Sequence, residues 1–197
     1  MTRIHACSPA KLNLFLHVTG RRPDGYHTLQ TVFQLLDWGD DMTFELREQA
    51  GITLSGDTDD LPPEDNLIMQ AAYALNQPER GAHIHITKRI PRGGGLGGGS
   101  SNAATTLRAL NTLWSLDLDQ RALLALAKPL GADVPVFTHG HSAWAEGIGE
   151  DLSPLALPAR WYAVIIPACE VQTSEIFSHP ELTRNTAPIT VAAFFSG

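Results

Sequence analysis

Cysteine is scarce in this sequence, and long apolar runs are absent. The 197 residues include only Cys7 and Cys169, which form no CxxC motif and no disulfide framework, as is typical of a reducing compartment. No apolar run approaches the ~20 residues of a membrane-spanning helix. Lys11 and Asn13 interrupt the stretch that a signal peptide would keep apolar. The sequence therefore predicts a cytoplasmic protein.

Positively charged residues are also few. The chain has 14 Lys and Arg residues against 21 Asp and Glu, a formal net charge of −7, which argues against general binding to nucleic acid. A hydrophobic fraction of 43% and a charged fraction of 18% exclude a disordered chain. The length suits one substantial core, or one domain with part of another.

Glycine, in contrast, is concentrated at one place. Residues 91–101 read Pro-Arg-Gly-Gly-Gly-Leu-Gly-Gly-Gly-Ser-Ser, and six of these eleven residues are glycine. A strand pattern precedes them at 83–88, and a helical period follows at 102–114, with Ser100 or Ser101 as the expected N-cap. Glycine lets backbone N–H groups approach a ligand, and a helix N-terminus adds free donors and a positive dipole end. The stretch predicts an anion-binding loop; the alternative is a flexible surface linker.

The two common glycine-rich nucleotide motifs do not fit this loop. It does not end in Gly-Lys-Ser/Thr, so the lysine of an ordinary P-loop is missing. Residues 93–98 satisfy G-x-G-x-x-G, but a second helical pattern follows at 119–128. A dinucleotide-binding unit needs a second strand ending in an acidic residue instead. The dinucleotide interpretation is therefore weak.

The rest of the chain predicts an α+β fold. Residues 52–54 are the expected hairpin partner of 42–47, after a break at 38–41. We expect a two-layer sandwich with a mixed, mainly antiparallel sheet and helices on one face. A Leu- and Pro-rich connection at 152–158 divides this domain, residues 1–155, from the start of a second α/β domain, residues 156–197. The expected strands are 3–7, 12–19, 28–37, 42–47, 52–54, 83–88, 141–150 and 161–167, and the expected helices are 65–75, 102–114 and 119–128.

Polar residues outside the loop are further candidates for chemistry. Lys11 and Asn13 share the polar face of a strand, for which a solvated surface is the simpler interpretation. Asp133 lies among small and apolar residues and is either a functional carboxylate or the N-cap of a short helix. Tyr26 and His27 follow a Pro-Asp-Gly turn, where they either contact a base or only flank the turn.

Taken together, three segments resemble the GHMP small-molecule kinases: residues 9–13 (Pro-Ala-Lys-Leu-Asn), 91–101 and 131–135 (Gly-Ala-Asp-Val-Pro). Residues 23–31, 64–68 and 146–150 narrow the resemblance to members that act on a cytidine diphosphate derivative, and it runs from about residue 8 to residue 186. The resemblance implies a ribosomal protein S5 domain 2-like fold. It also implies transfer of the γ-phosphoryl group of ATP, with Mg²⁺, to the tertiary 2-hydroxyl of a methylerythritol moiety in the non-mevalonate isoprenoid pathway.

The same resemblance implies roles for individual residues. Asp133 matches the catalytic base, and Lys11 matches the lysine that holds and polarises the aspartate and the hydroxyl. The Mg²⁺ ligands are not assigned, and Ser100 and Ser101 are candidates by residue type only. The implied ATP-binding residues are Pro91, Arg92, Gly93, Gly94, Gly95, Leu96, Gly97, Gly98, Gly99, Ser100, Ser101 and Asn66. The implied substrate-binding residues are Asn13, Tyr26, His27, Thr173 and Phe177.

Family members continue beyond this point into a second domain with a Gly-Thr-Gly motif, so we expect this chain to be a truncated or partial enzyme. Two other functions stay open: a catalytically silent nucleotide-binding fragment, and another GHMP kinase acting on mevalonate, homoserine or a sugar. Tyr26, His27 and Phe177 favour a cytidine substrate, because a base stacks on aromatic faces and a small polyol does not. A nucleic-acid-binding module is disfavoured by the acidic balance.

Overall fold

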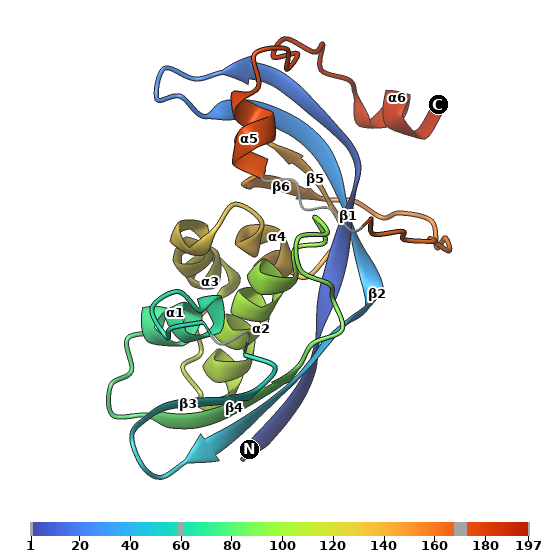
Figure 1. Cartoon of the computed structure of the whole chain (residues 1–197). Coiled ribbons are helices and arrows are strands. Elements are labelled where there is room, and N and C mark those ends of the chain that lie inside the picture. The colour runs from blue at the N-terminus through green and yellow to red at the C-terminus, as the bar shows by residue number, and fades with distance from the viewer. Residues whose placement is uncertain (1, 59–60, 168–172, 197) are drawn as a thin grey trace.

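Two very long antiparallel strands, β1 (Arg3–Arg21) and β2 (His27–Arg47), run through the whole molecule (Figure 1). The computed structural model describes residues 2–58, 61–167 and 173–196. One edge of β2 pairs with β1. The other edge pairs with β5 (Ala143–Glu146) at residues 31–33 and with β4 (Gly81–Thr87) at residues 41–47. β6 (Asp151–Pro154) and β3 (Gly51–Gly56) complete the mixed, mainly antiparallel sheet that the sequence predicted.

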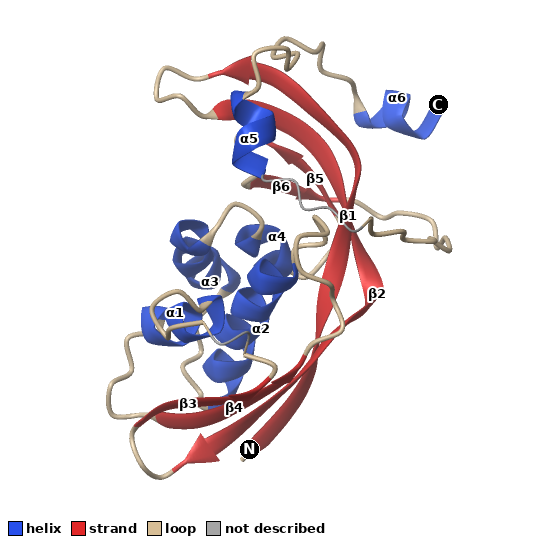
Figure 2. Cartoon of the chain, viewed as in Figure 1, coloured by secondary structure: helices blue, strands red, loops and turns tan. Residues whose placement is uncertain are grey.

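Helices α1 to α4 cover one face of this sheet, which confirms the two-layer α+β sandwich (Figure 2). Strand β4 explains the layering, because Ala82, Ile84 and Ile86 are buried beneath the helices while the alternating residues point away. Further along the chain lie α5 (Thr173–Ser178) and α6 (Val191–Ser196). No helix in the described part of the chain is long and apolar enough to cross a bilayer. The helices that cover the sheet are α1 (Leu67–Ala74), α2 (Gly98–Leu113), α3 (Gln120–Ala127) and α4 (Val134–His139), with a 3₁₀ turn at Lys128–Leu130 before α4.

The predicted interruptions at residues 8–10 and 38–41 were wrong, because both segments stay within the long strands. Pro9 pairs with Gly39, and the register then shifts between Pro9 and Lys11. A Cβ on Gly39 would lie 2.0 Å from the Ser8 carbonyl oxygen, so only glycine fits there. The residues that looked like breaks form a β-bulge between two continuous strands.

Two other strand assignments were also wrong. Strand β3 does not form a hairpin with residues 42–47 but pairs in parallel with β4, so α1 crosses between the two. Residues 161–167 form no strand, and Trp161 is fully exposed. Besides β2, β5 pairs with β6 at 151–154, which overlaps the stretch 152–158 that was expected to be a connection. β-propensity alone cannot assign a strand, because a strand needs a neighbouring edge to pair with.

Candidate active site

The bulge in β1 fixes the glycine loop. Because the register slips after Pro9, the backbone N–H of Lys11 leaves the β1–β2 ladder and donates to the carbonyl of Leu96 at 3.0 Å. Leu96 is buried beside Ala10 and Ile90. The middle of the glycine loop is therefore anchored to the strand that carries Lys11.

The loop takes the backbone conformation that its glycines permit. Gly93, Gly95 and Gly97 have φ values of +67°, +69° and +75°, and Gly97 is the N-cap of α2. Helix α2 begins at Gly98, so the prediction of a serine N-cap was wrong: the backbone enters the helix from a left-handed glycine, without a side-chain cap. The first N–H groups of a helix have no partner within the helix. They lie beside the loop, which fits an anion such as a phosphate.

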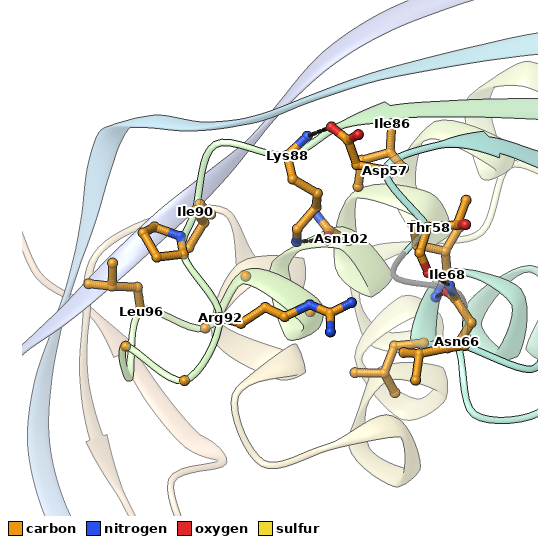
Figure 3. A pocket seen from close by; sticks show the side chains of 18 of the residues that line it. Asp57, Thr58, Asn66, Ile68, Ile86, Lys88, Ile90, Arg92, Leu96 and Asn102 are labelled. Atoms are coloured by element: carbon orange, nitrogen blue, oxygen red, sulfur yellow. Dashed lines mark hydrogen bonds between the residues drawn. The ribbon is translucent and has the colours of Figure 1, made fainter. Parts of the chain in front are cut away.

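The loop encloses a cavity of about 280 Å³ (Figure 3). Arg92 extends across it from the loop toward Asn66, and Lys88, which also lines it, points toward Asn102. Asn66 caps α1, accepts from the Ile68 N–H at 2.9 Å and donates to the Thr58 carbonyl at 3.4 Å. Cationic, amide and backbone donors thus surround a cavity whose residues at 91–99 are those predicted to bind ATP.

Gly97 is the glycine of the loop that tolerates a side chain least. A Cβ there would lie 2.8 Å from the Phe137 ring and 3.3 Å from Lys11 Cε, whereas a Cβ on Gly95 would meet nothing within 4 Å. Both residues have positive φ, so both alanine variants carry the same backbone strain of about 1–2 kcal/mol. We expect Gly97→Ala to lose about 1–3 kcal/mol more than Gly95→Ala because of the overpacking. Urea unfolding of the two variants tests this, and equal midpoints would contradict it.

A buried polar network fixes the segment that leads into the glycine loop. Asp40 is fully buried, and its carboxylate accepts from the N–H groups of Arg89 (2.7 Å) and Ile90 (2.8 Å), from Lys88 Nζ (2.8 Å) and from Asn102 Nδ2 (2.9 Å). Burial opposes ionisation of Asp40, but these hydrogen bonds outweigh it and hold the pKa of Asp40 below its usual range. Residues 88–90 are therefore fixed where they lead into the loop.

The two serines after the loop have different surroundings. Ser101 is buried, and its hydroxyl accepts a hydrogen bond from the Ser8 hydroxyl at 2.8 Å, so its side chain belongs to the network around Asn102. Ser100 instead lines a second cavity together with Asp133. The structure therefore brings only the Ser100 side chain toward the predicted catalytic residues.

This second, central cavity has a volume of about 540 Å³ and contains the Lys11–Asp133 pair. Lys11 Nζ lies 3.2 Å from Asp133 Oδ2 and donates to Asn13 Oδ1 at 2.7 Å, so Lys11 and Asn13 do point the same way. Asn13 Nδ2 donates to the Thr31 hydroxyl at 2.9 Å, which directs the amide oxygen toward Lys11. Asp133 precedes α4 but makes no capping hydrogen bond, so the N-cap role does not account for its carboxylate.

Burial explains why this ion pair is held in one arrangement. The Lys11 side chain is 7% exposed and its ammonium lies 5.5 Å from the centre of the Phe33 ring, while the Asp133 side chain is 33% exposed. A largely buried ammonium needs its partners, because an unpaired charge there is costly. One carboxylate is thus oriented by a lysine and still open to the cavity.

A third cavity of about 510 Å³ contains Tyr26, His27 and Phe177. The Phe177 ring of α5 stacks on His27 of β2, with ring centres 5.3 Å apart and an angle of 30°. Tyr26 is 63% exposed on the turn between β1 and β2. The side chain of Thr173 lies outside the described residues. The structure thus gathers three of the predicted substrate-binding residues, with His27 and Phe177 in direct contact.

The three cavities are neighbours and share lining residues. Gly95 and Gly97 line both the loop cavity and the central cavity. Leu29, Ile148 and Phe177 line both the central and the aromatic cavity. A ligand in the central cavity therefore has the glycine loop on one side and the aromatic rings on the other, with Asp133 lining the cavity itself.

Several residues of the site were missed by sequence reasoning. Asp40, Asn102 and Thr31 make their hydrogen bonds to residues far away in the chain, and Asp40 was expected to lie in a break between two strands. The one local signal was the pair of adjacent acids, Asp40 and Asp41, between two apolar strand halves. Alternation along β2 would have placed Asp40 on the buried face with Met42 and Phe44.

Comparison with known proteins first identifies the class of protein to which this chain belongs. Residues 66–141 match the family model of the GHMP kinases N terminal domain. A solved homoserine kinase from Cytophaga hutchinsonii shares the fold over the whole chain, with a TM-score of 0.56 at 18% identity, and the match spans 64% of that chain. The chain thus has the fold of a GHMP-type kinase, and the family match includes the glycine loop.

More similar proteins narrow this class. A solved 4-(cytidine 5'-diphospho)-2C-methyl-D-erythritol kinase is 45% identical, with a TM-score of 0.68 over 79% of this chain and 56% of that one. Two 4-diphosphocytidyl-2-C-methyl-D-erythritol kinases match over almost the whole chain, from Alkalilimnicola ehrlichii (52% identical over 98% of this chain) and Marinobacter nauticus (54% over 100%). The chain belongs to the family of 4-diphosphocytidyl-2-C-methyl-D-erythritol kinases. It spans 67% and 70% of the length of these two curated relatives.

Proposed function

We propose that this chain carries the catalytic site of an ATP-dependent kinase that phosphorylates the 2-hydroxyl of 4-diphosphocytidyl-2-C-methyl-D-erythritol. The observation that carries the proposal is the position of the Lys11–Asp133 pair, 3.2 Å apart, in a cavity between the glycine loop and the aromatic residues. The substrate has the matching order of parts: a hydroxyl to be phosphorylated at one end and a cytosine base at the other.

In the proposed reaction, Asp133 accepts the proton of the 2-hydroxyl as the oxygen attacks the γ-phosphorus of ATP. The bond between the γ-phosphorus and the β,γ-bridging oxygen breaks, and ADP leaves. Lys11 orients the Asp133 carboxylate and stabilises the negative charge that develops on the attacking oxygen. Asn13 holds Lys11 in place through the 2.7 Å hydrogen bond to its ammonium. Phosphoryl transfer depends mainly on such positioning and charge stabilisation.

The loop cavity is the proposed site of ATP. The backbone N–H groups of residues 93–99 and the N-terminus of α2 suit the phosphates, and Arg92 and Asn66 line the same cavity. The described residues include no group of three His, Cys, Asp or Glu side chains that could hold a metal ion by themselves. Mg²⁺ is commonly held by substrate phosphates with one or two protein groups, and Ser100, which lines the central cavity, is the candidate side chain of this chain. When bound, Mg²⁺ neutralises charge on the phosphates.

The aromatic cavity is the proposed site of the cytosine. Phe177 and Tyr26 offer ring faces for stacking, and His27 offers a ring nitrogen for a hydrogen bond. Thr173 remains a predicted substrate-binding residue. A mevalonate or homoserine molecule would leave these rings without a partner, which favours the cytidine substrate over those of other GHMP kinases.

We also propose that residues 1–155 form the ATP-binding and catalytic domain and that residues 156–197 begin a second domain. Exposed apolar side chains in this second part, Trp161 and Ile165 among them, support the division. The cytoplasmic location remains a prediction from the sequence.

The experiment measures ADP release with 4-diphosphocytidyl-2-C-methyl-D-erythritol, mevalonate or homoserine as the acceptor. It uses the 197-residue chain and a chimera that continues it with the C-terminal third of the Marinobacter nauticus relative. We expect turnover of the cytidine derivative alone. Turnover by the chimera but not by the shorter chain would make the shorter chain a silent nucleotide-binding fragment. Turnover of a different acceptor, or none in a folded chimera that binds ATP, would contradict the proposed function.

A further inference from the structure

Arg184 connects the two elements that form the aromatic cavity. Its guanidinium donates to the carbonyls of Leu182 (3.0 Å), Phe177 (3.0 Å) and His179 (2.7 Å) at the end of α5 and beyond it. Its Nε donates to His27 Nε2 at the start of β2, at 3.1 Å. One half-buried side chain therefore holds Phe177 beside His27.

This contact determines which His27 nitrogen carries hydrogen. A guanidinium has only donors, so the His27 Nε2 that faces Arg184 must offer a lone pair. His27 is then neutral and carries its hydrogen on Nδ1. Burial, Arg184 and Arg21 lower the pKa of His27, which agrees with a neutral ring near pH 7. Asp24, which also lines the cavity, pairs with Arg22 at 2.8 Å instead of with the His27 ring.

We propose that Arg184 is a positioning residue that fixes His27 as an Nδ1–H donor and thereby makes the aromatic cavity select cytosine over uracil. This inference rests on the proposed function, since it takes the cavity as the base site. Cytosine presents two adjacent acceptors, N3 and O2, whereas uracil presents an N3–H donor at the same place. A fixed donor is satisfied by cytosine and opposes the uracil N3–H, and a buried group left without its partner costs binding energy.

The first test observes the unaltered protein and uses a variant only to assign the signals. Nitrogen-15 NMR of the His27 ring distinguishes a protonated nitrogen from one with a free lone pair, and a His27→Gln variant assigns the signals. We expect a protonated Nδ1 and an unprotonated Nε2 at pH 7. A protonated Nε2 would overturn the inference, whether or not the protein is a kinase.

The second test measures base selectivity by calorimetric titration with CDP and UDP, with the glycine-loop site saturated with ADP. We expect CDP to bind at least about tenfold more tightly than UDP, and Arg184→Met to remove most of this preference. In the active chimera, the same variant should raise KM for the cytidine substrate while KM for ATP stays unchanged. Arg3→Met, an exposed arginine paired with Glu45 at the far end of β1, is the matched control.

The outcomes separate this inference from the proposed function. Equal affinities for CDP and UDP in the unaltered protein, or a preference that survives Arg184→Met, would overturn the role of Arg184. Selective CDP binding without turnover in the chimera would leave that role intact and contradict the kinase activity instead.

Discussion

Replacement of Asp133 by asparagine is expected to lower kcat for phosphorylation of the cytidine substrate about 10³-fold, within the range typical of a lost general base. The amide keeps the shape of the side chain, and its oxygen can still accept from Lys11, which lies 3.2 Å from the carboxylate. It cannot take up the hydroxyl proton. Because only the proton transfer is lost, KM for both substrates should change by less than about threefold.

Steady-state kinetics of the active form provide the measurement, and Asp117→Asn is the matched control. Asp117 is exposed, and its φ of +54° is a conformation that asparagine tolerates. It lines none of the three cavities. If Asp133→Asn retained full turnover while the control also did, another group would have to accept the proton, and the mechanism would be wrong.

The second large effect concerns stability. Asp40→Asn is expected to lower the free energy of unfolding by about 3–5 kcal/mol, as for other broken buried ion pairs. One carboxylate oxygen accepts from the backbone N–H groups of Arg89 and Ile90, and the other accepts from Lys88 and Asn102. An asparagine has one oxygen, so its NH₂ group must face one of these two donor pairs.

Urea unfolding measures this loss as a shift of the midpoint at constant slope. Glu45→Gln is the control, because the Arg3–Glu45 pair is solvent-exposed and should contribute at most about 1 kcal/mol. A similarly small loss in Asp40→Asn would show that the network around Asp40 does not stabilise the fold.

The loss of stability in Asp40→Asn should depend on pH in a definite direction. The folded pKa of Asp40 lies below its unfolded value, so ionised Asp40 stabilises the fold above the unfolded pKa of about 3.9. This stabilisation is lost as the pH falls through the folded pKa. The difference in free energy of unfolding between the unaltered protein and Asp40→Asn should therefore be constant from about pH 6 to 8 and shrink below about pH 4. A difference that grew in acid would contradict the assignment.

The parts of the site that depend on local sequence could be predicted. The glycine loop follows from its composition and from the strand and helix on either side of it. Asp133 was recognisable as a candidate functional residue because a carboxylate among small and apolar residues is unusual for a solvated surface. Periodicity also placed Lys11 and Asn13 on one face, and the hydrogen bond between them agrees.

The parts that depend on distant pairing could not be predicted. The bulge at Pro9 looked like a strand break. It is possible because the paired residue, Gly39, has no side chain and lets the Ser8 backbone come close. Arg184 reaches His27 across 157 positions of sequence, and no local pattern marks that contact. Such contacts are fixed by tertiary packing, which overrides local propensity.

The most direct test of the central claim is a crystal structure of the active form with 4-diphosphocytidyl-2-C-methyl-D-erythritol and a non-hydrolysable ATP analogue. The quantity to measure is the distance between the substrate 2-hydroxyl oxygen and the Asp133 carboxylate. We expect a hydrogen bond of about 2.6–3.2 Å, with the triphosphate in the glycine loop and the cytosine against Phe177. A 2-hydroxyl outside hydrogen-bonding reach of Asp133, or a cytosine bound in the glycine loop, would contradict the proposed site.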